Sequence, residues 1–117
     1  MGLRYIDLAM STKRLAFLEQ LVASGTKDTM PHYGLAQEYR SLGRIGDAEN
    51  AFLALRALDA SYVPQYLMAG QMFESAGRKD DAQAWYEAGI AAAEASRNSH
   101  ALGELKSALD ALLGVTP

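Results

Sequence analysis

Cysteine is absent from this chain, which excludes disulfide bonds and thiolate chemistry. Cysteine usage therefore gives no information about the cellular compartment. No apolar run approaches the roughly 20 residues that a membrane-spanning helix needs. Basic residues are not concentrated as phosphate binding requires: the net charge is −3, and the isoelectric point is near 5.3. We therefore expect neither nucleic acid nor a membrane as a partner.

Groups suited to catalysis or metal binding are also scarce. The two histidines, His32 and His100, do not have metal-ligand spacing, and no Gly-rich phosphate loop lies between a strand and a helix. The pair Asp80-Asp81 lies at the start of a predicted helix, where the helix dipole favours negative charge without any chemistry. We expect no enzyme activity, no catalytic residue, no metal and no cofactor.

The first ten residues carry no recognisable targeting signal. Asp7 interrupts a very short apolar region, so Met1–Ile6 lacks the form of a secretory signal, and we expect a cytoplasmic protein. We interpret residues 1–10 as an N-terminal arm with three open alternatives. The arm extends the first helix, packs as a strand-like segment, or forms a disordered leader.

What the chain does have is an internal repeat. Half of its residues are hydrophobic, and the stretch Leu42–Ala48 returns 34 residues later as Ala76–Ala82. A fixed period of about 20–50 residues is the signature of a stacked-repeat architecture. Sliding Pro31–Ala60 onto Gln65–Glu94 gives eight identical positions: Gln37/Gln71, Ser41/Ser75, Gly43/Gly77, Arg44/Arg78, Asp47/Asp81, Ala48/Ala82, Ala54/Ala88 and Ala57/Ala91.

Helices are the only regular elements that the pattern predicts, because apolar residues recur at helical spacing and strand-like alternation never lasts. In the first helix, Phe17 widens the apolar stripe. Between the second and third helices, Ile45-Gly46 is expected to form a turn. The predicted helices span about 11–24, 30–42, 47–58, 62–76, 80–96 and 101–113. We expect stops at Gly25, Gly43, Gly77 and Gly114, and caps at Ser11 or Thr12, Thr29, Ser61 and Ser99.

The repeated stretches resemble tetratricopeptide repeats, whose pattern is Trp-x2-Leu-Gly-x2-Tyr, then Ala-x3-Phe, then Pro, on a period of 34. The first copy is His32-x2-Leu35-Ala36-x2-Tyr39, then Ala48-x3-Phe52, with Ala60 at the proline position. The second copy is Tyr66-x2-Ala69-Gly70-x2-Phe73, then Ala82-x3-Tyr86, with Glu94 at the proline position. The resemblance covers about Met30 to Ser96 and implies an all-α, right-handed α-solenoid of helix–turn–helix repeats.

The domain organisation follows from this resemblance. We expect a single helical domain over residues 11–117, with repeats at about 29–60 and 61–96 and a C-terminal capping helix at 99–113. Ser11–Ser24 is the opposite cap. In the last helix, Lys106 falls in the slot that Ala36 and Gly70 occupy, which is tolerable only where no partner helix follows.

First helices of such repeats line a concave face, and the side chains left pointing there form a candidate peptide-binding groove. These residues are Tyr33, Gln37, Arg40, Leu67, Met68, Gln71 and Glu74. A Met and a Leu at such slots suit variable partners. The alternative is that the N-terminal arm or the last helix covers the groove, which makes these residues core. The Lys, Asn and Arg clamp that some family members use for carboxylates is disfavoured, since only Arg40 offers a cation nearby.

The resulting prediction is a non-enzymatic protein–protein interaction module that binds an unknown protein or peptide on its concave face. The alternative is a structural self-association module, a homodimer that buries its end helices or groove. Two further choices stay open in the sequence. Arg44 and Arg78 are solvated turn residues or a small partner site, and Trp85 is core or a convex-surface anchor.

Overall fold

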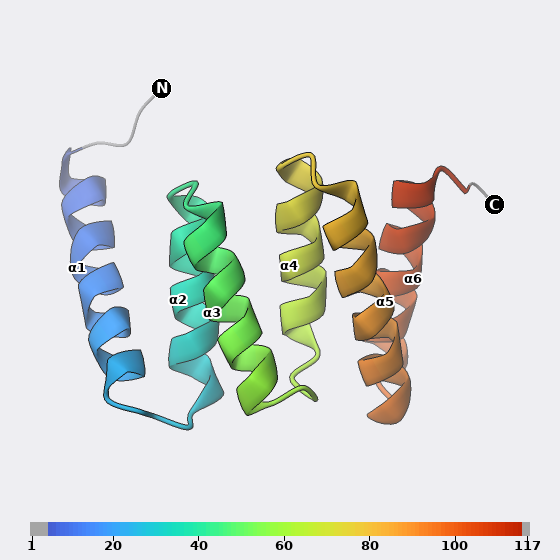
Figure 1. Cartoon of the computed structure of the whole chain (residues 1–117), viewed down its shortest axis with the longest axis horizontal. Coiled ribbons are helices and arrows are strands. Elements are labelled where there is room, and N and C mark those ends of the chain that lie inside the picture. The colour runs from blue at the N-terminus through green and yellow to red at the C-terminus, as the bar shows by residue number, and fades with distance from the viewer. Residues whose placement is uncertain (1–4, 116–117) are drawn as a thin grey trace. The chain divides into compact units, whose positions relative to one another are not determined.

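The computed structural model describes residues 5–115, with side chains from Thr12 onward. All regular structure in this part of the chain is helical, which confirms the predicted all-α class. The elements are α1 (Tyr5–Ala23), α2 (Thr29–Ser41), α3 (Ile45–Leu58), α4 (Pro64–Ser75), α5 (Lys79–Ala95) and α6 (Ser99–Leu113) (Figure 1).

The first helix begins earlier than the cap prediction allowed. Because α1 starts at Tyr5, residues 5–10 of the expected arm extend the first helix, and Ser11 and Thr12 lie inside it rather than capping it. No Gly or Pro separates Tyr5 from Ser11, and Leu, Ala and Met between them favour a helix. Residues 1–4 of the arm lie outside the described residues.

The other predicted caps are also displaced. Asp28, not Thr29, caps α2, because its Oδ1 accepts a hydrogen bond from the Met30 N–H at 3.2 Å. Asn98, not Ser99, caps α6 through Ala101 N–H, at 3.0 Å. Asp and Asn are among the preferred cap residues, and each stands one position before the expected one.

At α4, a proline at the beginning of the helix takes the place of the expected side-chain cap. The Ser61 N–H donates to Asp59 Oδ1 at 3.0 Å, so Ser61 belongs to a turn that precedes the helix. The helix then begins at Pro64, which needs no donor at its first position.

The described residues divide into two compact units, one ending at Leu58 and the other beginning at Asp59. The division lies within two residues of the expected boundary between the repeats, at 60/61. Each unit holds one complete helix pair and one additional helix, α1 in the first unit and α6 in the second. That both units form one domain over 11–117 stays a prediction.

In the first unit, α2 and α3 form an antiparallel pair and α1 packs against α2 (Figure 1). Ala36, Ala48 and Phe52 are fully buried in this unit. A Cβ on Gly34 would lie 3.5 Å from the Leu18 side chain, so α1 approaches α2 at that point. Phe17 contradicts the prediction that it widens this stripe, because its side chain is 60% exposed.

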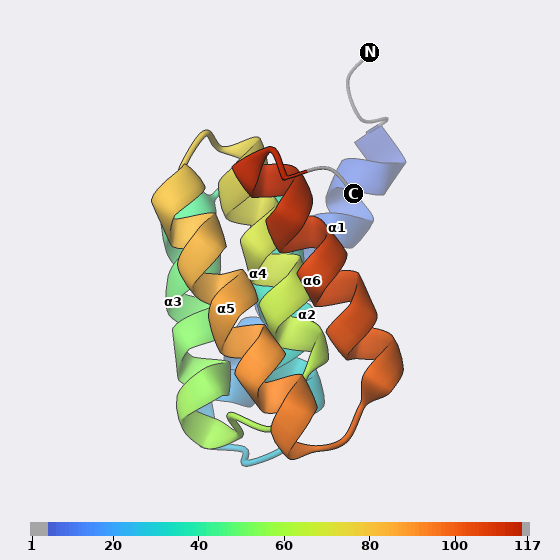
Figure 2. The same cartoon turned by 90° about the vertical axis from the view of Figure 1, so that its right-hand side faces the viewer.

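In the second unit, α5 runs antiparallel to α4, and α6 lies alongside both, in the direction of α4 (Figure 2). Leu105 on α6 is buried, as the predicted cap requires, and Lys106 is exposed. Trp85 is also buried, with its ring centroid 5.9 Å from that of Tyr66. Trp85 is therefore a core residue.

The two helix pairs bend at equivalent glycines, as the repeat predicts. Gly43 has a φ of 73° and Gly77 a φ of 76°, a backbone conformation that glycine adopts without steric cost. In each bend the N–H of the residue after the glycine donates a hydrogen bond back across the turn. Arg44 N donates to Tyr39 O at 2.9 Å, and Arg78 N donates to Phe73 O at 2.8 Å. One detail of the prediction is wrong, since the bend ends at Arg44 and Ile45 already begins α3.

Glycines inside α4 and α5 permit very close helix packing in the second unit. A Cβ on Gly70 would overlap the Tyr86 ring, so this small position lets the ring pack directly against α4. A Cβ on Gly89 would lie 2.5 Å from Tyr66 Cβ and 2.9 Å from Leu105 Cδ2. Gly89 thus lets α5 pack closely against both α4 and α6.

We predict that Gly89→Ala lowers the free energy of unfolding by about 2 kcal/mol. Alanine gains about 1 kcal/mol of helix propensity, but overpacking against Tyr66 Cβ costs roughly 3 kcal/mol, because an atom next to the backbone cannot move aside. Urea unfolding followed by circular dichroism measures the change. Gly46→Ala is the matched control, since its Cβ would meet nothing within 4 Å. Equal stability of the two variants would contradict the packing argument.

Candidate functional site

The seven predicted groove residues are divided between the two units. Tyr33, Gln37 and Arg40 lie on α2 in the first unit, and all three are half-buried. The Gln37 side-chain amide donates to the Tyr33 hydroxyl at 3.4 Å, one helical turn away. These two residues therefore form one contiguous patch along α2.

The four residues on α4 have different surroundings. Leu67 and Gln71 line a groove between α4 and α6 and are half-buried. Glu74 is exposed, but its Oε1 accepts a hydrogen bond from the Tyr86 hydroxyl at 2.9 Å, which ties it to α5. Met68 is half-buried and does not line the groove. The structure thus brings two of the four together in one hollow, which α6 borders without burying Leu67 or Gln71.

The groove in the second unit has a volume of about 600 Å³ and is open to solvent. Its other wall comes from α6, which we expected only to cap the stack. The lining residues on α6 are Ser99, His100, Gly103, Glu104, Ser107 and Ala108. One signal in the sequence pointed to them: residues 100, 103, 104 and 107 recur at helical spacing and none of them is apolar.

The groove is lined by one carboxylate, Glu104, and one imidazole, His100, and no Lys or Arg lines it. His100 Nε2 lies 3.2 Å from Glu104 Oε1, one turn along α6. The His100 side chain is 89% exposed and the Glu104 side chain 49% exposed. An exposed pair of this kind contributes little stability, so both groups remain available to a ligand.

A second hollow of about 490 Å³ lies in the same unit along α5. Five alanines and three residues with hydroxyl groups line it: Ala60, Ala88, Ala91, Ala92, Ala95, Ser61, Tyr66 and Ser96. This hollow therefore has no charged or amide side chain that would orient a ligand.

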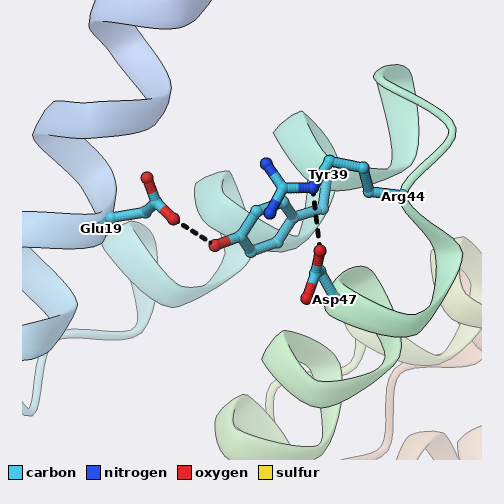
Figure 3. Close-up of polar contacts among 4 residues, drawn as sticks. All are labelled: Glu19, Tyr39, Arg44 and Asp47. Atoms are coloured by element: carbon cyan, nitrogen blue, oxygen red, sulfur yellow. Dashed lines mark hydrogen bonds and ion pairs between the residues drawn. The ribbon is translucent and has the colours of Figure 1, made fainter.

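In the first unit, four polar and aromatic side chains meet at the bend between α2 and α3 (Figure 3). The Tyr39 hydroxyl donates to Glu19 Oε2 at 2.6 Å, which joins α2 to α1. The Arg44 guanidinium lies 4.6 Å from the centre of the Tyr39 ring, and its Nε donates to Asp47 Oδ2 at 2.8 Å. The cluster therefore links all three helices of the unit.

We call the contact of an arginine with both an aromatic ring and an aspartate the arginine clamp. It recurs in the second unit. Arg78 lies 4.5 Å from the centre of the Phe73 ring and donates to Asp81 Oδ2 at 2.8 Å. Phe73 has no hydroxyl, so only the first clamp extends to a third helix. The arginine of each repeat is thus a turn residue with a structural role, which favours the first of our two interpretations of Arg44 and Arg78.

Burial raises the pKa of Tyr39 to about 12, and the hydrogen bond to Glu19 and its negative charge act in the same direction. Both effects disfavour the phenolate, which carries a charge that burial penalises and Glu19 repels. Tyr39 is therefore a neutral hydrogen-bond donor at physiological pH.

The two histidines lie in different units. His32 is half-buried, and its Nε2 lies 3.2 Å from the Thr26 carbonyl oxygen in the turn that precedes α2. His100 is the exposed residue of the groove. Among the side chains that the structure describes, from Thr12 to Val115, no three of His, Asp or Glu gather as metal ligands. Across residues 5–115, every helix is too short or too polar to cross a bilayer.

The fold and its bends define a helical-repeat protein, and comparison with solved structures gives the family. A tetratricopeptide repeat domain protein from Salinibacter ruber is 31% identical, with a TM-score of 0.70 over 76% of this chain and 90% of that one. The chain belongs to the tetratricopeptide repeat family.

A protein from Bordetella parapertussis has the same fold, with a TM-score of 0.72 and 23% identity over 85% of this chain and 86% of that one. No family model matches the sequence, and no curated protein matches it. The two proline positions of the repeat pattern, which hold Ala60 and Glu94 here, are one departure of this chain from the family pattern.

We predict that stability falls between pH 10 and pH 12 more steeply in the natural chain than in Tyr39→Phe. Below pH 10 Tyr39 is protonated in both states; between 10 and 12 only the unfolded chain loses its proton, so folding is disfavoured. A shift of about two pKa units corresponds to about 2–3 kcal/mol. Phe73 shows that phenylalanine fits this position of the clamp.

Urea unfolding of both proteins at pH 8, 10 and 11.5 tests this prediction. The natural chain should be about 1 kcal/mol more stable at pH 8, because it keeps the hydrogen bond to Glu19. That advantage should shrink as the pH rises. A constant difference across the three pH values would show that Tyr39 titrates normally.

Proposed function

We propose that this chain is a non-enzymatic interaction module that binds a peptide or protein segment. The observation that carries the proposal is the groove between α4 and α6, which includes Leu67 and Gln71, two of the residues expected on the concave face. Grooves between helices that combine apolar and polar side chains are common binding sites. Tyr33, Gln37 and Arg40 on α2 are the proposed binding residues of the first unit.

Catalysis has little support in either unit. Tyr39 has a raised pKa, and its hydroxyl is engaged by Glu19 within a structural clamp. A reactive site would combine perturbed titratable groups with a cleft. The groove residues Glu104 and His100 instead form an exposed pair, which suits binding.

We predict that Leu67→Lys combined with Gln71→Lys abolishes capture of the partner from a lysate of the native host. Two long charged side chains would fill the groove and remove its apolar contact, while the far-ultraviolet circular dichroism stays helical because both residues are only half-buried. The matched control is Asn50→Lys combined with Ala84→Lys, which adds the same charge at exposed positions outside the groove. Capture that survives in the first variant would refute the site.

Self-association is the second candidate, and Phe17 favours it. This side chain on α1 is 60% exposed, and burial of a phenylalanine is worth about 1.5–3 kcal/mol per copy. A symmetric dimer that pairs the same face of two chains would bury Phe17 of both.

This candidate predicts a dimer at high micromolar concentration, with a mass by light scattering of roughly twice 12.6 kDa. Phe17→Gln should restore the monomer mass without loss of helix, since it removes an exposed ring only. A monomer of the natural chain under these conditions would eliminate self-association and leave the interaction module unaffected.

A further inference from the structure

We propose that the groove between α4 and α6 selects an extended peptide carrying a lysine or arginine beside a small aliphatic residue. This inference rests on the proposed binding function and names the class of partner. It is carried by the charge of the groove, by a glycine that packing does not require, and by the arrangement of its polar groups.

The charge of the second unit favours a cationic partner. From Asp59 onward the sequence has eight acidic and four basic residues, so this unit carries more negative charge than the whole chain. Within the groove, Glu104 is the one carboxylate and neither Lys nor Arg lines the walls. Its contact with His100 is exposed at both ends, so an entering ammonium or guanidinium can displace the imidazole and form a charge-assisted hydrogen bond.

Gly103 has no packing role that accounts for it. The two helix-interior glycines of α4 and α5, Gly70 and Gly89, are required because a Cβ would overlap a neighbour. A Cβ on Gly103 would meet nothing within 4 Å, although glycine in a helix interior weakens the helix. Because Gly103 has no side chain, the backbone of α6 is exposed in the wall of the groove. Glycine at such a place permits close approach of another backbone.

The remaining lining suits a peptide main chain. Ser99, Ser107 and Gln71 together offer hydroxyl and amide groups that both donate and accept hydrogen bonds. Leu67 and Ala108 supply a narrow apolar surface that fits a small aliphatic side chain. The absence of a lysine or arginine from the lining disfavours a carboxylate or phosphate ligand.

The test uses three libraries of random octapeptides whose central residue is fixed as Arg, Gln or Glu, each passed over the immobilised full chain. We expect the Arg library to be retained roughly tenfold better than the Glu library, the ratio that one charge-assisted hydrogen bond gives. Glu104→Gln should reduce that ratio to about twofold or less. The backbone amide signals of Gln71, Gly103 and Ser107 should shift in the ¹⁵N spectrum on addition of the selected peptides.

Gly103 provides a control whose effects on binding and stability have opposite signs. Gly103→Ala should raise the midpoint of thermal unfolding, because it improves the helix and meets no neighbour, and yet weaken retention of the Arg library several-fold. Gly103→Leu should abolish retention while remaining folded. Unchanged retention in both variants would overturn the proposal that a peptide backbone approaches α6 there.

The outcomes separate the two levels of the argument. Equal retention of the three libraries, with shifts at the groove amides, would overturn the basic partner and leave the binding module standing. Preference for the Glu library would do the same. No retention of any library and no shift in the groove would overturn both the partner class and this groove as the binding site.

Discussion

One bend between paired helices is the constraint on which each unit depends, and the chain builds it twice from the same kinds of side chain. A glycine with positive φ turns the backbone, and the following arginine lies over the aromatic ring of the helix just ended. The same arginine pairs with an aspartate in the first turn of the helix about to begin. The ion pairs are exposed and individually weak, but the ring contact and the backbone hydrogen bonds of the turn act on the same residues. Five of the eight identical repeat positions lie in or beside this bend: Ser41/Ser75, Gly43/Gly77, Arg44/Arg78, Asp47/Asp81 and Ala48/Ala82.

The bend brings the helices together, and small residues then set how near they come. In the second unit, Gly70 admits the Tyr86 ring, and Gly89 admits both Tyr66 and Leu105. The contact at Gly89 has a consequence beyond packing, because Leu105 is the one fully buried residue of α6. By seating Leu105 against α5, the glycine holds α6 where its polar face borders α4. The groove therefore depends on a residue that does not line it.

Much of the fold was readable from the sequence, because periodicity, glycine stops and the aromatic slots all report on the same repeated bend. The N-cap residues of the helices were harder to predict. Asp28 and Asn98 stand next to other good cap residues, and only the backbone geometry decides which of two neighbours caps the helix. Phe17 was misassigned because a helix with a single partner buries only one narrow stripe. For the site, the sequence identified the α4 side of the groove but missed α6, whose polar stripe resembles a solvated cap. The role of Tyr39 was also out of reach, because its partner Glu19 lies 20 residues away on another helix.

The turn between α5 and α6 adopts the same backbone path as the two glycine bends, but with Arg97 at the position of positive φ, at 57°. It is the sole non-glycine residue with that conformation between residues 5 and 115. An L-residue held there stores about 1–2 kcal/mol of backbone strain. The first two residues beyond its cap, Ser99 and His100, belong to the wall of the groove. The wall of the groove therefore follows the one turn, among the described residues, in which a residue with a side chain occupies this glycine-type backbone conformation.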